Sequence, residues 1–178
     1  MSSITNLFTP LIGQLMWGIH RGHGSALMME FGKPHLRVRN PIQPRHSVDT
    51  RVRENLSRRR IFPSGQWGFL IMDSEWEVSA FSKTCHCNNA KAKVDAALEC
   101  LDGQQLVSVD MEPDNRWFVM TFDLGGKLRV SLFPQVEGAC WSLSNSDEGI
   151  IAAYENGELR NEPATQCTAG GIVVLNNP

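Results

Sequence analysis

The chain has 178 residues, of which 42% are hydrophobic and 20% are charged, and its formal net charge is −2. This composition excludes a disordered acidic or polybasic chain, and the length suits one domain with a core of its own. We therefore predict a single domain over residues 1–178.

The N-terminal segment predicts neither a secretory signal nor a membrane anchor. Residues 1–6 lack a basic region, and the apolar stretch at residues 7–19 is interrupted by Pro10, Gly13 and Gln14. No apolar run reaches the roughly 18 residues that a membrane helix needs. The odd number of cysteines suits a reducing compartment better than a disulfide framework. We predict a cytoplasmic protein that does not bind membranes.

Short strands are predicted in the first part of the chain. Residues 16–19 and 25–31 are typical of two strands joined by a glycine-rich turn. Residues 35–39 alternate polar with apolar side chains, as a half-buried strand does.

The segment at residues 40–60 interrupts this pattern. Pro41 and Pro44 break regular structure, and arginines are concentrated here. We predict a long, Arg-rich surface loop that is mobile without a partner. Its candidate partner-binding residues are Arg51, Arg53, Arg58, Arg59 and Arg60.

A hairpin and a further strand are predicted next. Residues 60–62 and 66–72 flank the turn-forming sequence Pro63-Ser64-Gly65, which is typical of a hairpin. Residues 75–81 alternate, with Trp76 on one face and Glu75 and Glu77 on the other, where we expect solvated carboxylates.

One helix is predicted, at residues 89–102. Apolar residues recur at i, i+3, i+4 and i+7 from Val94 onward. We expect Asn88 or Asn89 to cap its start, and Gly103 to end it.

Strands return in the second half, with turn residues between them. The predicted strands are residues 105–111, 116–122, 127–133, 139–143 and 149–154, and a turn at Asn156-Gly157 and a last strand at 172–175 follow. This order predicts a mainly β (α+β) fold, an antiparallel sandwich or a partly open barrel with one main helix across one end. The large side chains expected in its core are Trp67, Trp76, Phe118, Phe122, Leu128 and Trp141.

Charge is divided unequally between the two parts of the chain. Residues 1–72 hold ten Lys and Arg against three acids, whereas residues 73–178 hold seven against sixteen. Such asymmetry suggests a polarised surface that steers a charged partner, unless folding interleaves the two parts. The acidic residues that could bind a partner are Asp110, Glu112, Asp114, Asp147 and Glu148.

The sequence offers weak candidates for chemistry. The cysteines of Cys85-His86-Cys87 are separated by a single residue, whereas structural zinc sites space cysteines by two to four and need a second pair, so we predict no metal and no cofactor. His23 and Ser25 lack a recognisable third group of a catalytic triad, which predicts a turn and leaves a hydrolase as a distant alternative.

Five parts of the sequence carry a resemblance: Gly22-His23-Gly24-Ser25 with Met29-Glu30-Phe31-Gly32, residues 65–71 with Trp76, residues 101–106, residues 121–128 and Trp141-Ser142-Leu143. Together these phrases resemble a loosely characterised bacterial family of β-rich immunity proteins of polymorphic toxin systems, including contact-dependent growth inhibition. The resemblance implies a cytoplasmic, non-enzymatic protein that binds one toxin domain tightly. The 40–60 segment lies outside these phrases.

We therefore predict a toxin-neutralising protein that binds through charged surface. A basic nuclease would select the acidic residues, and an acidic partner would select the arginines. The alternative from another class is a nucleic-acid-binding module that uses the arginines, although Phe62 is the only aromatic residue beside them.

Overall fold

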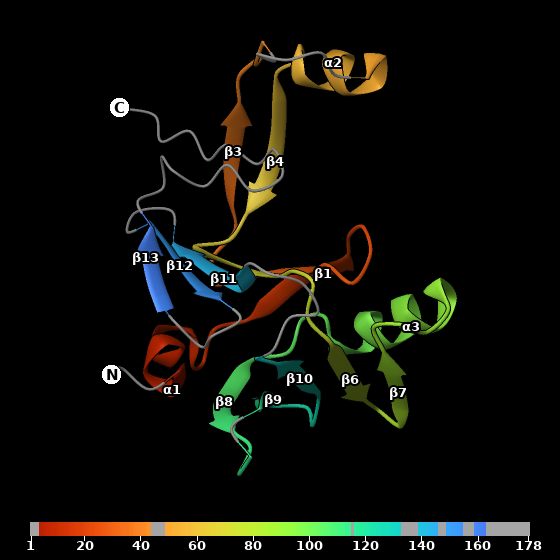
Figure 1. The fold of residues 1–178 in the computed structure, drawn as a ribbon, viewed down its shortest axis with the longest axis vertical. Coiled ribbons are helices and arrows are strands. Elements are labelled where there is room, and N and C mark those ends of the chain that lie inside the picture. Colours follow the sequence, from red (N-terminus) through yellow and green to blue (C-terminus); the bar gives the residue numbers. More distant parts are fainter. Residues whose placement is uncertain are drawn as a thin grey trace.

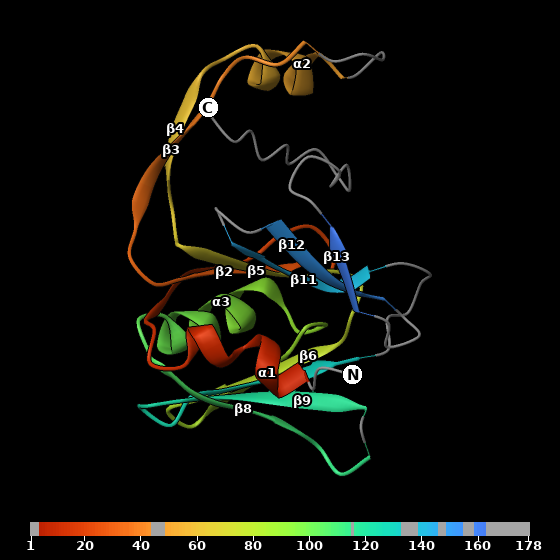
Figure 2. The ribbon, with the colours of Figure 1, turned by 90° about the vertical axis from the view of Figure 1, so that its left-hand side faces the viewer.

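Two antiparallel sheets lie one above the other in the computed structural model (Figure 2). The structure describes residues 4–43, 49–114, 116–132, 139–145, 149–154 and 159–162. The six-stranded sheet has the order β1-β2-β5-β11-β12-β13, and the five-stranded sheet has the order β7-β6-β10-β9-β8. This arrangement confirms the predicted mainly β fold, in the form of an antiparallel α+β sandwich.

The six-stranded sheet contains strands from both ends of the described chain. Its strands are β1 (Met16–Arg21), β2 (Leu27–Phe31), β5 (Trp67–Ile71), β11 (Ala139–Asn145), β12 (Gly149–Tyr154) and β13 (Leu159–Glu162). The predicted strands at 16–19, 25–31, 139–143 and 149–154 are confirmed. The predicted turn at 156–157 and strand at 172–175 lie outside the described residues.

The five-stranded sheet is built around the predicted meander. Its strands are β6 (Trp76–Ala80), β7 (Lys83–His86), β8 (Leu106–Met111), β9 (Trp117–Phe122) and β10 (Lys127–Ser131). β9 pairs with β8 and β10, which confirms the meander, and β6 pairs with the other edge of β10. β7 was not predicted from the sequence, because its four residues lack a clear alternation.

The hairpin predicted around Pro63-Ser64-Gly65 is wrong. β4 (Arg60–Ser64) pairs with β3 (His35–Arg39), whereas β5 pairs with β2 and β11. At this point the chain passes from one sheet to another. Gly65 allows the passage, because a Cβ there would lie 2.6 Å from the backbone oxygen of Phe31.

The main helix, α3 (Lys91–Leu101), is slightly shorter than predicted. It packs against β1, β6 and β7, and Figure 2 shows it between the two layers of strands. Gly103 follows it with φ of +81°, as expected of a glycine that ends a helix. The predicted asparagine cap is wrong: the N-cap is Ala90, and the Asn89 side chain instead accepts a hydrogen bond from the N–H of His86 at 3.0 Å.

The core lies between the two sheets. All six side chains that we expected to be buried are at most 8% exposed. An aromatic cluster of Phe8, Phe69, Phe118 and Trp141 lies at its centre, with ring centroids 5.3–6.4 Å apart. Such spacing is favourable for aromatic pairs. Phe69 and Trp141 belong to the six-stranded sheet and Phe118 to the five-stranded one, so the cluster joins the two layers.

The described N-terminal segment carries two short helical elements. They are α1 (Ile4–Leu7) and the 3₁₀ helix η1 (Thr9–Leu11). Phe8, between them, is fully buried. The apolar stretch at the start of the chain therefore supplies part of the core.

Candidate functional site

The Arg-rich segment forms a projection from the body of the protein (Figures 1 and 2). We call residues 35–64 the arm. The arm comprises the two-stranded ribbon of β3 and β4 and, at its tip, the helix α2 (Thr50–Leu56). In Figure 1 the arm lies at one end of the molecule, and β8 and β10 lie at the other.

The predicted loop at 40–60 is therefore corrected by the structure. Residues 50–56 are helical, residue 60 begins β4, and residues 44–48 lie outside the described part. The Asp49 side chain caps α2 by accepting a hydrogen bond from the N–H of Arg51 at 2.8 Å. The helix has only seven residues and none is buried, so it is too short to show the repeated apolar spacing by which a sequence reveals a helix.

Asn55 connects the tip of the arm to the ribbon. Its backbone oxygen accepts a hydrogen bond from Arg39 Nη2 at 2.6 Å, and its side-chain oxygen accepts one from Arg60 Nη2 at 2.6 Å. Arg59 Nε donates to the side chain of Asn40 at 3.1 Å. Arg39, Arg59 and Arg60 thus help to hold the arm together.

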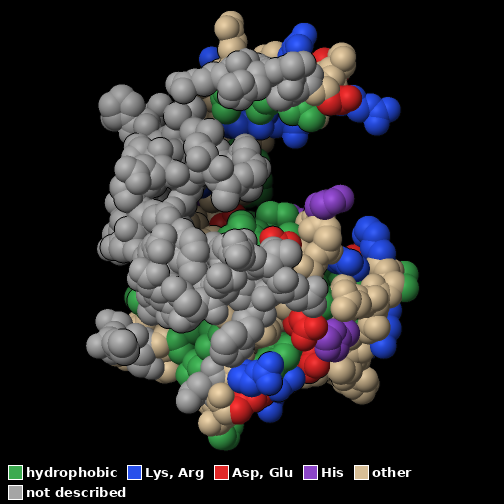
Figure 3. All heavy atoms as spheres, in the orientation of Figure 1, with side chains coloured by type: hydrophobic (Ala, Val, Ile, Leu, Met, Phe, Trp, Pro, Cys, Tyr) green, Lys and Arg blue, Asp and Glu red, His purple; other side chains and the backbone are tan. Residues whose placement is uncertain are grey.

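The remaining candidate arginines, Arg51, Arg53 and Arg58, are exposed. Their side chains have no ion pair or hydrogen bond within the described part of the chain. The arm as a whole contains eight arginines and only two acids, Asp49 and Glu54. Figure 3 shows Lys and Arg side chains gathered at the tip, away from the body. The arm can therefore attract an acidic partner.

The two faces of the ribbon differ in chemistry. Directly opposed residues share a face, and the pairs Leu36–Pro63 and Val38–Ile61 form a fully apolar one. Leu36, Val38 and Ile61 are 73%, 49% and 64% exposed. The predicted strand at 35–39 is confirmed as β3, but the prediction that it is half-buried is wrong, because the ribbon projects and the described body does not cover this face.

The opposite face of the ribbon is basic. It carries Arg37, Arg39 and Arg60, together with Phe62, whose side chain is 41% exposed. Arg37 lies near enough to Glu30 of the six-stranded sheet to lower the pKa of that carboxyl group by its charge. At the root of the arm, the positive charge of Arg37 therefore acts on an acidic side chain of the body.

Glu30 marks the root of the arm. Its Oε2 accepts a hydrogen bond from the N–H of Gly65, where β4 leads into β5, at 2.9 Å. Burial raises the pKa of the Glu30 carboxyl above its ordinary value of 4.5, and this effect outweighs the opposing hydrogen bond and the charges of Arg37 and His20. The carboxylate therefore bears a desolvation cost at neutral pH.

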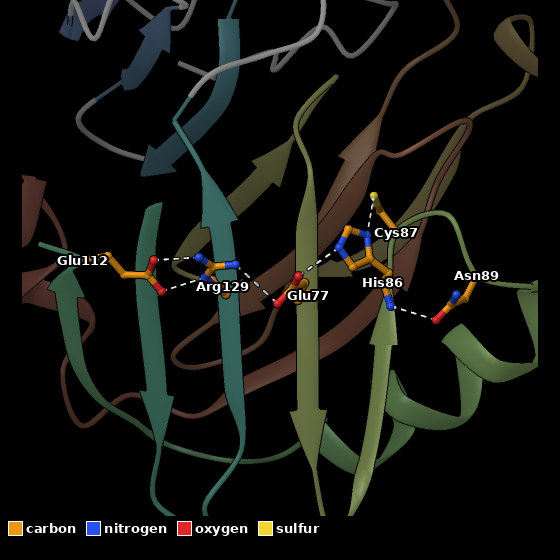
Figure 4. Close-up of polar contacts among 6 residues, drawn as sticks. All are labelled: Glu77, His86, Cys87, Asn89, Glu112 and Arg129. Carbon is orange, nitrogen blue, oxygen red and sulfur yellow. Dashed lines mark hydrogen bonds and ion pairs between the residues drawn. The ribbon is translucent and has the colours of Figure 1, made fainter. Parts of the chain in front are cut away.

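The acidic candidates on the opposite end of the molecule are partly neutralised within the protein. Arg129 binds Glu112 with two hydrogen bonds of 2.6 and 2.7 Å and packs 4.0 Å above the ring of Trp117. The guanidinium group of Arg129 lowers the pKa of Glu112. Arg129 also lies 3.5 Å from Glu77, whose carboxylate accepts a hydrogen bond from His86 Nε2 at 2.9 Å (Figure 4). These side chains form a row across β10, β6 and β7.

We expected Glu77 to be a solvated carboxylate; its side chain is 35% exposed, and it also pairs with His86 and Arg129 in this row. The row could not be found from sequence because its members are far apart in the chain. Asp110 accepts a hydrogen bond from Ser108 Oγ at 2.7 Å, and Asp114 accepts one from the N–H of Arg116 at 3.0 Å. Asp147 and Glu148 lie outside the described residues.

The residues considered as metal ligands and those considered as catalytic groups lie in different surroundings. Cys85 and Cys87 are 2% exposed, and burial raises the pKa of Cys85. Among the described residues, no three His, Cys, Asp or Glu side chains converge as metal ligands. His23 and Ser25 lie in the β1–β2 turn, where their backbone oxygens accept hydrogen bonds from Ala26 N and Trp76 Nε1. No described hydrogen bond joins their two side chains.

Comparison with protein-family models, with curated proteins and with solved structures finds no match for this chain. Within the described part of the chain, no helix combines the length and apolar character needed to cross a membrane.

The two carboxyl groups with shifted pKa values predict opposite pH dependences. Because the folded-state pKa of Glu30 is raised, the folded protein holds this proton more tightly, and the contribution of Glu30 to stability is lost as the pH rises above about 4.5. Gln keeps the acceptor for Gly65. We therefore expect the stability of Glu30→Gln relative to wild type to increase as the pH rises from 4 to 7, in urea denaturation at each pH.

Glu112→Gln is the matched comparison. The folded-state pKa of Glu112 is lowered, so its contribution is present above about pH 4.5 and is lost as the pH falls through the folded-state pKa. We expect the stability of Glu112→Gln relative to wild type to decrease over the same rise in pH. If the stability of both variants depends on pH in the same way as that of wild type, the raised pKa of Glu30 and the lowered pKa of Glu112 are both contradicted.

Proposed function

We propose that this chain is a non-enzymatic, cytoplasmic immunity protein that binds and neutralises a bacterial toxin domain, and that the arm is its toxin-binding element. The observation that carries the proposal is the arm itself. It is a projecting ribbon and helix with an exposed aliphatic face and arginines that have no partner among the described residues.

The energetics of the arm favour a binding role. A two-stranded ribbon is marginally stable alone, and burial adds little here, because α2 buries no residue and only Ser64 of β4 is buried. Exposed aliphatic side chains that lie together are typical of interaction sites. A partner that covers Leu36, Val38 and Ile61 would supply the burial that the arm lacks.

The charges favour the arginines over the acidic residues as the binding surface. Glu112 is paired with Arg129, and Asp110 and Asp114 accept hydrogen bonds from their neighbours. Arg51, Arg53 and Arg58 have no such pairing in the described chain. The toxin surface that meets the arm is therefore acidic, and opposite charges speed its capture.

The arginines also support a second candidate, binding of nucleic acid. Phosphates would meet the basic face, but they would leave the aliphatic face uncovered. Phe62 is the only aromatic side chain of the arm, so the ribbon also lacks a stacking platform. We rank this candidate below a protein partner.

Co-expression tests the proposed function. A toxin domain encoded beside this chain is expressed in a sensitive host with and without it. We expect survival only when this protein is present, a stoichiometric complex on co-purification, and a Kd of about 1 nM or tighter. Filter binding to RNA and DNA at increasing salt is the control. Failure to protect, together with salt-dependent nucleic-acid binding that Arg58→Ala weakens, would favour the second candidate.

A further inference from the structure

We infer that the outer edge of β3, opposite β4, accepts an extended segment of the partner as an added β-strand, in which acidic and apolar side chains alternate. This inference rests on the proposed function for the identity of the partner, and it specifies how the arm binds. Three features of the ribbon carry it: the chemistry of its two faces, its open edge and its charge.

The alternation of acidic and apolar side chains in the added strand follows from the two faces of the ribbon. Successive side chains of a strand point to opposite faces of a sheet, so a strand added beside β3 extends both faces of the ribbon, with every second side chain next to the β3 side chains of each face. One face presents Leu36, Val38 and Ile61, and the other presents Arg37, Arg39 and Arg60. An added strand that is apolar on one side and acidic on the other complements both faces at once.

No described strand pairs with the outer edge of β3. β3 pairs only with β4 among the described strands, and β4 only with β3. Backbone N–H and C=O groups on such an edge are a template for another strand, and this mode of peptide recognition recurs among proteins. β4 contains Pro63, which lacks an N–H group, whereas all five residues of β3 retain theirs. We therefore place the added strand beside β3.

Other partners fit these observations less well. A second copy of the chain would bring two arms with eight arginines each together, and like charges oppose that contact. An anionic membrane would need the apolar and basic side chains on one side, because a flat surface cannot cover opposite faces of a ribbon. A strand is the partner that reaches both faces.

Designed peptides test the inference without the toxin. The probe is a peptide of about eight residues in which Glu and Val alternate, long enough to overlap β3. It is compared with a block peptide of the same composition, four Glu followed by four Val, and with an alternating Lys–Val peptide. Titration into the isotopically labelled full chain, followed by amide chemical shifts, measures both affinity and location.

The inference predicts that the alternating Glu–Val peptide binds at least about tenfold more tightly than the block peptide, and that the Lys–Val peptide does not bind. The largest shifts should fall on residues 35–39. N-methylation of every second peptide residue on the side that faces β3 should weaken binding about tenfold, because it removes main-chain donors. Equal affinity for alternating and block peptides, no effect of N-methylation, or shifts that leave β3 unchanged would each overturn it.

A pair of variants locates the site on the protein. Val38→Glu places a carboxylate on the aliphatic face and should weaken binding of the alternating peptide about tenfold. The matched control is Val107→Glu, because Val107 on β8 is 52% exposed and Val38 is 49% exposed. Equal effects of the two substitutions would overturn the assignment to the arm.

The outcomes also separate this inference from the proposed function. Peptide binding to β3 without protection from the toxin would refute the immunity role and keep the strand site. Protection with a tight complex that neither Val38→Glu nor an excess of the alternating Glu–Val peptide weakens would support immunity and refute strand addition.

Discussion

Truncation of Phe118 to alanine is expected to lower the free energy of unfolding by about 3–5 kcal/mol. Phe118 is fully buried on β9, and its ring lies 5.6–6.4 Å from those of Phe8, Phe69 and Trp141. Because these rings come from both sheets and from the N-terminal segment, the truncation opens a cavity at the junction of the layers. Loss of transfer free energy and of ring contacts both contribute.

The matched control is Phe81→Ala, which makes the same substitution at a side chain that is 59% exposed. We expect it to change the free energy of unfolding by about 0.5 kcal/mol or less. Urea denaturation followed by tryptophan fluorescence and by circular dichroism measures both variants. The predicted single domain requires one transition that coincides by the two probes. Two separated transitions would contradict the prediction of a single domain. Equal effects of the two substitutions would contradict the central role of the aromatic cluster.

Reversal of the three arginines without described partners should slow association with the toxin domain by about 10- to 100-fold. The variant combines Arg51→Glu, Arg53→Glu and Arg58→Glu. These side chains are exposed and form no described ion pair, so the reversal should leave the fold intact and act through long-range attraction. Stopped-flow or surface-plasmon measurements at low and high salt follow the rate, and the difference from wild type should shrink as salt rises.

The control for this experiment changes the net charge equally at another place. It reverses Lys91, Lys93 and Lys127, which are exposed on α3 and β10. We expect this control to slow association less than about threefold. A third variant reverses Asp110, Glu112 and Asp114 to lysine. If the acidic variant impairs binding and the arginine variant does not, the toxin binds the five-stranded sheet and the arm is not its site.

The amino-acid sequence by itself determined the local elements of this protein. Period-2 alternation located most of the strands, as at Trp76, Val78 and Ala80, which all face the core. The i, i+3, i+4 spacing located α3, whose Val94, Ala97, Leu98 and Leu101 are buried. Both signals arise because each element buries one face, and each can be read within a few residues.

The tertiary structure alone decided which strands pair. The sequence around Pro63 and Gly65 carries turn residues whether the chain folds back or continues into another sheet, so the predicted hairpin was wrong. The contacts of Asn55 with Arg39 and Arg60, and of Arg129 with Glu112 and Glu77, join residues whose spacing in the chain has no local signature. Strand pairing is non-local, and the same alternating pattern satisfies many partners.

The candidate site was likewise determined in part by the sequence and in part by the tertiary structure. Composition alone located the arginines, because their concentration is visible without any fold. Their arrangement on a projecting ribbon with one aliphatic face required the register of β3 with β4, since a shift by one residue would exchange the two faces. That register depends on contacts between residues 35–39 and 60–64, which lie on either side of a segment whose sequence predicts only a loop.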